Sequence, residues 1–124
     1  MIGATIKSLL VANAGLTALV PEASIFPYVA NEDTALPLIV YMIDSLEPEY
    51  DKDAWAGDIC NFSVASFSED YANLQLIVKQ VRLALDLKKA TGILRIMATG
   101  FNEAYNEGIF GNKLSFQVKV NSYS

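Results

Sequence analysis

The fold of this chain follows from the segment Asp58–Leu87, which reads DICNFSVASFSEDYANLQLIVKQVRLALDL. Its first part, Ile59–Phe67, is rich in residues that favour β-strands. Ser68 stands where a helix N-cap is expected, and Glu69 and Asp70 place negative charge in the first helical turn, where the helix dipole favours it. The segment therefore predicts a strand that leads directly into a helix.

The helical part of this segment has one apolar face. Its apolar residues recur at steps of three and four, as on one side of a helix of about five turns. These residues are Tyr71, Leu74, Ile77, Val78, Val81 and Leu85. Lys88, Lys89 and Gly92 then supply the positive charge and the glycine that are typical of a helix end. A strand followed by such a helix needs further strands for the helix to cover.

The residues before this unit predict a first helix and two strands. The first helical face carries Ile2, Ile6, Leu9 and Leu10. Gly15 is placed to end that helix in a left-handed conformation. Ser24–Val29 is extended, and its Pro27 indicates an edge strand because proline cannot donate to a ladder. Leu36–Ile43 is almost unbroken in its apolar character, so it is either a central strand covered twice or a strand whose outer face meets another subunit. We expect it to pair with Ile59–Phe67.

Two further strands joined by a long hairpin arm close the chain. Ile93–Thr99 predicts one strand, and Asn112–Tyr123, in which apolar and polar residues alternate, predicts the other. Glycines and asparagines between them mark bends. The fold class is therefore α+β. We expect a single domain over residues 1–124 with a largely antiparallel sheet of four to five strands, and an N-terminal helix and one long helix packed on one face.

The segment Glu47–Asp58, EPEYDKDAWAGD, predicts a charged loop between two strands. An interaction loop has this composition, but so does an ordinary solvated hairpin whose two aromatic residues fold back. Apolar residues near the tip of the closing hairpin form a second candidate surface. The candidate interaction residues of both segments are Glu47, Glu49, Tyr50, Asp51, Asp53, Trp55, Phe101, Tyr105 and Phe110.

The composition excludes several classes of function. The 124 residues include no histidine and one cysteine, which excludes Ser-His-Asp and Cys-His catalysis, histidine-bearing zinc sites and an intrachain disulfide. Cys60 is interpreted as a small core residue. A net charge of −5 with scattered basic residues gives no electrostatic footprint for nucleic acid. No segment has the length of a membrane span or the pattern of a secretion leader, so we expect a soluble, unprocessed, intracellular protein.

Motifs for cofactors and metals are missing from the sequence as well. Asp51 and Asp53 begin like a calcium loop, but Phe62 stands where the bidentate glutamate should be. The glycines at 100, 108 and 111 make neither a P-loop nor a dinucleotide-binding motif. A pair of catalytic carboxylates and a Ser-Lys dyad stay open, because a sequence does not give distances.

The order of elements carries a family resemblance. After an N-terminal helix come Ser24–Val29, the proline-led apolar strand Leu36–Tyr41, the serine-acid helix start Phe67–Asp70 and the closing strand Leu114–Val118. Together they resemble small tail-completion, or tail-terminator, proteins of long-tailed bacteriophages and their prophage relatives. The resemblance implies a structural protein that is not an enzyme and has no cofactor, metal or catalytic residue.

The resemblance also implies an assembly. Subunits would form a homo-oligomeric ring, typically of six, that docks on the end of the tail tube, stops its growth and offers a surface to the head connector. The protein would act in the cytoplasm of the bacterial host and then in the virion tail, with no membrane and no sequence-specific nucleic acid as partner. Acids such as Glu47, Glu49, Asp51, Glu103 and Glu107 would then line the lumen. The alternatives are a non-catalytic ligand-binding or regulatory module, another head-tail connector component, and a compact enzyme of unfamiliar mechanism.

Overall fold

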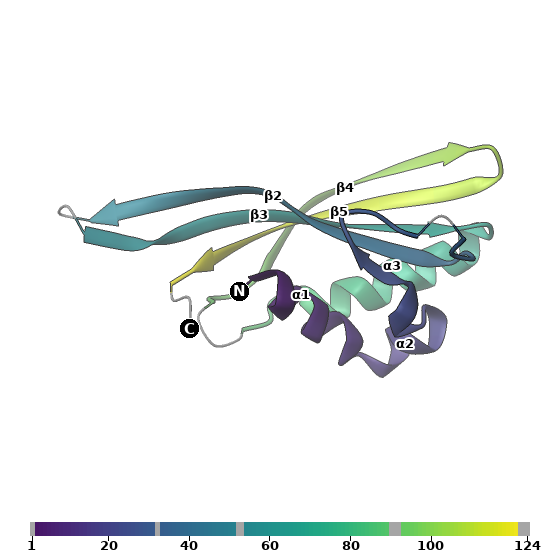
Figure 1. Cartoon of the computed structure of the whole chain (residues 1–124), viewed down its shortest axis with the longest axis horizontal. Coiled ribbons are helices and arrows are strands. Elements are labelled where there is room, and N and C mark those ends of the chain that lie inside the picture. Colours follow the sequence, from purple (N-terminus) through teal and green to yellow (C-terminus); the bar gives the residue numbers. More distant parts are fainter. Residues whose placement is uncertain (1, 32, 52–53, 90–92, 122–124) are drawn as a thin grey trace.

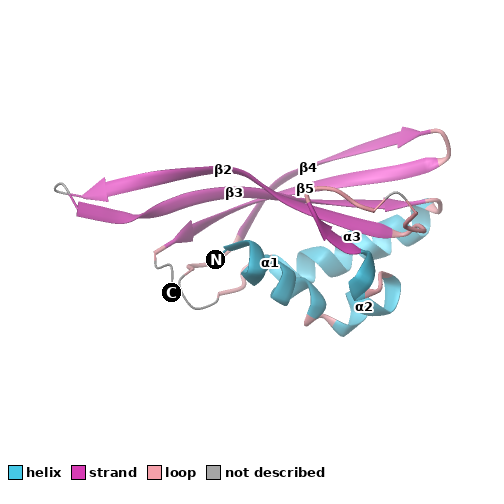
Figure 2. Ribbon diagram, viewed as in Figure 1, coloured by secondary structure: helices cyan, strands magenta, loops and turns pink. Residues whose placement is uncertain are grey.

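A computed structural model, which describes residues 2–31, 33–51, 54–89 and 93–121, shows a five-stranded sheet with helices on one face (Figure 1). The helices are α1 (Ile2–Val11), α2 (Ala14–Leu19) and α3 (Tyr71–Leu85), with a short 3₁₀ turn at Glu22–Ser24. The strands are β1 (Ile25–Pro27), β2 (Leu38–Asp51), β3 (Ala54–Ser68), β4 (Met97–Asn106) and β5 (Ile109–Val120). The helices lie below the sheet in Figure 2, so the predicted α+β class is confirmed.

The strands follow the order β1-β2-β3-β5-β4, so β3 is the central strand. Only β1 runs parallel to its neighbour, and the other three pairs are antiparallel. Leu38 lies opposite Phe67 and Ile43 lies opposite Phe62, which confirms the predicted pairing of the apolar run with the strand before α3. The segment with Pro27 is an edge strand, as predicted.

The core fills the space between the sheet and the helices. The rings of Phe62 on β3 and Phe116 on β5 stack there with their centroids 5.2 Å apart. α1 contributes Ile6 and Leu10, and α3 contributes Ile77 and Val81, all without solvent exposure. These residues lie at the positions that the helical spacing of the sequence predicted.

Both ends of α3 differ from the prediction. Asp70, not Ser68, is the N-cap, and its carboxylate accepts a hydrogen bond from the amide of Ala72 at 3.1 Å. Ser68 cannot cap the helix because it is still a strand residue, paired with Phe110. The helix ends at Leu85, about one turn early, where Leu87 takes a left-handed conformation and donates its amide to Ile96. Gly92, which was expected to end the helix, lies outside the described residues.

The first helix also ends earlier than predicted. α1 stops at Val11 because Asn13 turns the chain, and its side chain accepts a hydrogen bond from the amide of Leu16 at 3.0 Å. Gly15 therefore lies inside α2 and is not the C-cap of the first helix.

The closing hairpin is longer and starts later than expected. Ile93 makes only an isolated bridge to Val120, and the strand β4 begins at Met97 and runs well beyond Thr99. β5 begins at Ile109 rather than Asn112, and the predicted end at Tyr123 falls outside the described residues. Glu107 and Gly108 form the turn, both with positive φ. Such a two-residue turn matches the twist of the paired strands and lets the ladder continue to the tip.

Candidate interaction surfaces

The described residues of the segment Glu47–Asp58 form strands rather than the predicted loop. β2 and β3 remain paired as far as Asp51 and Ala54, so most of the segment forms the end of a long β-hairpin. The backbone groups that the two strands turn toward each other are paired, which allows charged residues to stand in strands. We call the described residues 46–51 and 54–58 the acidic arm. Figure 1 shows this hairpin extending beyond the helices at one end of the molecule.

A glycine and a buried acid lie at the base of the acidic arm. Gly57 has a φ of +125°, next to a register shift between β2 and β3. A Cβ at this position would lie 2.7 Å from the carbonyl oxygen of Val120, so only glycine fits. Asp58 is buried, and its Oδ1 accepts a hydrogen bond of 3.0 Å from the indole Nε1 of Trp55. This contact holds the Trp55 ring on the arm.

The acidic arm has an apolar face and a charged face. Leu46 lies opposite the core residue Cys60, so it points to the helix side of the sheet. Tyr50 and Trp55 are cross-strand partners, and Trp55 reaches Asp58, whose partner in β5 is the core residue Val120. We therefore place both rings on the helix side as well.

The acids of the arm belong mainly to its other side. Glu47 and Glu49 alternate with the helix-side residues of β2, so they point away from the helices. Glu49 forms an ion pair of 3.2 Å with Lys119. Asp51 is exposed at the end of β2, and Asp53 lies outside the described residues.

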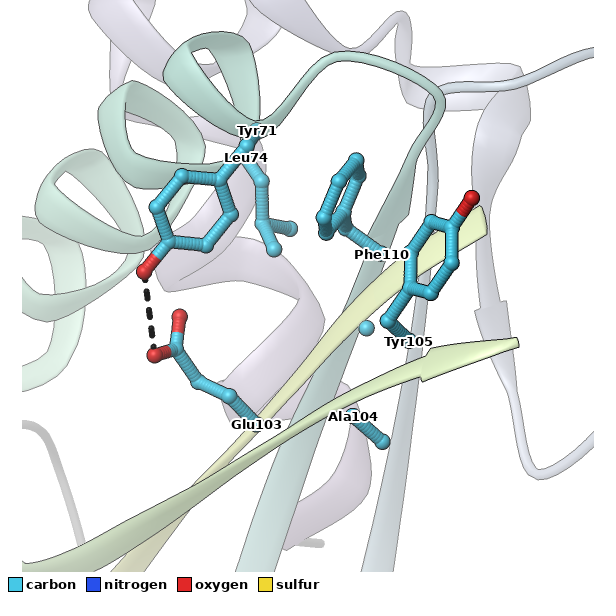
Figure 3. Close-up of a pocket in the computed structure, with 7 residues that line it drawn as sticks. Tyr71, Leu74, Glu103, Ala104, Tyr105 and Phe110 are labelled. Carbon is cyan, nitrogen blue, oxygen red and sulfur yellow. Dashed lines mark hydrogen bonds between the residues drawn. The ribbon is translucent and has the colours of Figure 1, made fainter. Parts of the chain in front are cut away.

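The β4–β5 hairpin forms a second projecting arm, whose aromatic residues are packed together. Phe110 lies between Tyr71 of α3 and Tyr105 of β4, with ring centroids 5.2 and 4.6 Å away. The hydroxyl of Tyr71 donates a hydrogen bond of 3.2 Å to Glu103 (Figure 3). These residues surround a hollow of about 260 Å³. Tyr105 is still 63% exposed, so the cluster presents an aromatic surface to solvent.

A second hollow, of about 270 Å³, continues from this cluster between α3 and β4. Phe101, which is 65% exposed, forms one wall together with Val78 of α3. Asn112 lines it too, and its buried Oδ1 has no hydrogen-bond partner in the described part of the chain.

The candidate residues therefore fall into two separate groups. Glu47, Glu49, Tyr50, Asp51 and Trp55 lie on the acidic arm, whereas Phe101, Tyr105 and Phe110 lie on the β4–β5 hairpin. The tips of the two hairpins point to opposite ends of the molecule (Figure 1). Within one subunit the two groups do not form one site.

The structure adds a third surface that sequence reasoning missed. Leu76, Leu83 and Leu87 lie on the outside of α3 and just past its end, with exposed fractions of 52%, 55% and 58%. Lys79, Arg82 and Lys88 surround them and line, with Leu83 and Leu87, a hollow of about 460 Å³. We call the three leucines the leucine stripe. Leu76 and Leu83 are seven residues apart and off the predicted core face, which is the signal that could have revealed them.

Chemical groups that could support catalysis are sparse. The described residues include no cluster of three or more His, Cys, Asp or Glu side chains that could hold a metal ion. Cys60 is fully buried, and desolvation, with smaller contributions from Asp44 and Asp58, raises the pKa of its thiol to about 11. Its reactive thiolate is therefore rare at neutral pH. No helix in the described ranges is long and apolar enough to cross a membrane.

Comparisons with known proteins agree with this geometry. A chain in the solved structure described as the virion of a native gene transfer agent particle has the same fold, with a TM-score of 0.81 and 18% sequence identity. The match covers 94% of this chain and 92% of that chain. No curated protein matches the sequence. Residues 4–106 match the family model described as tail completion protein gp17. The chain therefore belongs to the tail completion protein gp17 family.

Proposed function

We propose that this protein forms a ring that caps the tail tube and joins it to the head connector. Its family gives it a structural role in tail assembly. The ring is a more specific role than the family membership gives. The observation that supports it most directly is the pair of hairpins that carry exposed aromatic residues beyond the core. A free monomer has no use for such surfaces, because exposed apolar patches are usually sites of association.

The separation of the surfaces favours a ring over a two-fold dimer. Each subunit presents different groups at its two ends, and contacts between different patches repeat around an axis until they close. The β4 edge, which has no further strand partner among the described residues, adds a row of backbone groups that a neighbour or the tail tube can pair with.

The acids of the arm suit the lumen of such a ring. Glu47, Glu49 and Asp51 lie on a projecting hairpin, where a negative surface would let DNA pass without binding. Glu103 and Glu107 lie on or at the end of the other hairpin, so this proposal assigns the lumen to the acidic arm alone. A ring structure with a basic bore would overturn this assignment.

Deletion of the gene from the phage or prophage genome that encodes it tests the function. If the ring stops tube growth, electron microscopy of the deletion strain should show tubes of uncontrolled length without heads. Supplying the wild-type chain from a plasmid should restore tails of uniform length joined to heads. Tails of normal length that fail to join heads would instead indicate a connector role, and normal virions would contradict both.

A further inference from the structure

The acidic arm carries an apolar surface that its own subunit does not cover. Leu46, Tyr50 and Trp55 are 45%, 69% and 43% exposed, although they lie on the side of the sheet that the helices cover elsewhere. Figure 1 shows why: the hairpin extends past α1, so no helix lies beneath it. A sheet face with this composition exposes apolar side chains to water, which is unfavourable. A partner that covers the face removes this exposure.

The leucine stripe is a second uncovered surface, and it has the complementary chemistry. Its three leucines offer an apolar strip, and the exposed cations Lys79, Arg82 and Lys88 border it. Of these three cations, Arg82 alone has an ion pair within the described part of the chain, at 3.4 Å from Asp86, and that pair lies on the surface, where it contributes little.

The acidic arm as a whole and the border of the leucine stripe carry opposite charges, although Glu47 and Glu49 project from the far side of the arm. The described residues of the acidic arm include no lysine or arginine, and they include the acids Glu47, Glu49 and Asp51, of which Glu49 is paired with Lys119 of β5, together with the buried Asp58. The stripe is bordered mostly by cations. Opposite potentials steer two surfaces together and disfavour contacts of each surface with itself. The acidic arm of one copy therefore binds the leucine stripe of another copy more favourably than it binds another acidic arm.

We propose that the acidic arm of one copy lies across the leucine stripe of the next copy, with Leu46, Tyr50 and Trp55 against Leu76, Leu83 and Leu87. This inference rests on the ring proposed above and names the contact between its subunits. Because the contact joins two different patches, each subunit uses its arm on one neighbour and its stripe on the other. The acids on the far side of the arm then remain uncovered.

Complementary variants test the contact in purified protein. An arm variant carries Leu46→Ser and Tyr50→Ser, and a stripe variant carries Leu76→Ser and Leu83→Ser. All four positions are exposed, so both variants should fold. In sedimentation experiments each variant alone should associate at least about tenfold more weakly than the wild type. An equimolar mixture should form a one-to-one dimer and nothing larger, because one intact contact is available per pair.

The control carries Val29→Ser and Leu94→Ser, two exposed apolar residues that lie on neither hairpin arm nor the leucine stripe. It should associate like the wild type. Loss of association in the control alone, or a mixture of arm and stripe variants that stays monomeric while the wild type assembles, would overturn the proposal.

Cross-linking covers the case of weak association. Tyr50→Cys chains are mixed with Leu83→Cys chains under oxidising conditions at high concentration, and Val29→Cys chains mixed with Leu83→Cys chains serve as the control, since Val29 is exposed and lies on none of the named surfaces. The native Cys60 is fully buried and does not compete. We expect several times more disulfide-linked dimer from the first mixture. Equal yields would overturn the contact, while normal virions after gene deletion would overturn the proposed function and leave the contact standing.

Discussion

Cys60 shows how burial controls the chemistry of a single residue. In the folded chain its thiol has a pKa of about 11, against an ordinary value of 9.0, because desolvation and then the charges of Asp44 and Asp58 disfavour the thiolate. The folded state thus holds its proton more tightly than the unfolded state. The stabilisation is complete below pH 9 and is lost as the pH rises toward 11.

We expect the free energy of unfolding to fall by up to about 3 kcal/mol over this pH range, at about 1.4 kcal/mol for each pH unit between the two pKa values. Urea unfolding at a series of pH values measures the decrease. Cys60→Ala should remove this part of the pH dependence. Identical slopes in the wild type and the variant would show that other groups cause it.

Gly57 is a second residue that its surroundings control, because they leave no room for a side chain. Its φ is +125°, and an added Cβ would lie 2.7 Å from the Val120 carbonyl oxygen, so Gly57→Ala should cost about 1–3 kcal/mol of stability. Gly100→Ala is a matched control, because nothing lies within 4 Å of its added Cβ. Denaturant midpoints should fall clearly for the first variant and only slightly for the second. Equal midpoints would mean that the base of the acidic arm can shift to accept a side chain.

At the level of elements, α3 has to satisfy the core on one side and solvent or a partner on the other. Val81 has no exposure, whereas Leu83, two residues later, is 55% exposed. Val81→Asp should therefore prevent folding, since it buries an unpaired charge. Leu83→Ser should change the free energy of unfolding by about 0.5 kcal/mol or less. Thermal unfolding followed by circular dichroism separates the two, and the reverse order would contradict the burial of this helix.

The same helix shows what the sequence could and could not predict. Its core face follows from apolar spacing, and this prediction was correct because helical geometry places i, i+3 and i+4 together. The N-cap was wrong because Ser68 and Asp70 are both good caps, and the choice depends on how far the β3 ladder runs. The leucine stripe was missed because the seven-residue spacing of Leu76 and Leu83 off the core face does not by itself show that these leucines are left uncovered. Whether exposed leucines form an interface depends on which other surfaces of the molecule are uncovered.

The acidic arm was predicted as a loop for a related reason. Acids, a proline and a glycine are depleted in strands, so local propensity opposes a ladder through Glu47–Asp58. Tertiary pairing overrides this preference, since the strands on either side are already in register and the hairpin simply continues. The sequence already assigned the candidate residues to two segments, but no spacing rule could have indicated that the two hairpins point to opposite ends of the molecule.

At the level of the whole molecule, the charge is unevenly distributed. The acidic arm extends from one end, and the cations Lys79, Arg82 and Lys88 lie on the helix layer around the leucine stripe. The net charge of −5 by itself would predict repulsion between copies. The uneven distribution of charge predicts attraction instead of repulsion for one relative orientation, in which the acidic arm of one copy meets the helix layer of the next.

This asymmetry predicts a specific dependence on salt. If arm and stripe attract each other, raising NaCl from about 0.05 M to about 0.5 M should weaken self-association, because the screening length falls well below the separation of the charges. A variant with Lys79→Gln and Lys88→Gln should associate more weakly at low salt and respond less to salt. Lys113→Gln is the control, since Lys113 is exposed and alternates with the core residue Leu114, which directs it away from the helices. Analytical ultracentrifugation of the three proteins gives the comparison. Association that strengthens with salt in all of them would show that repulsion from the net negative charge dominates and that the cations beside the stripe do not attract the acidic arm.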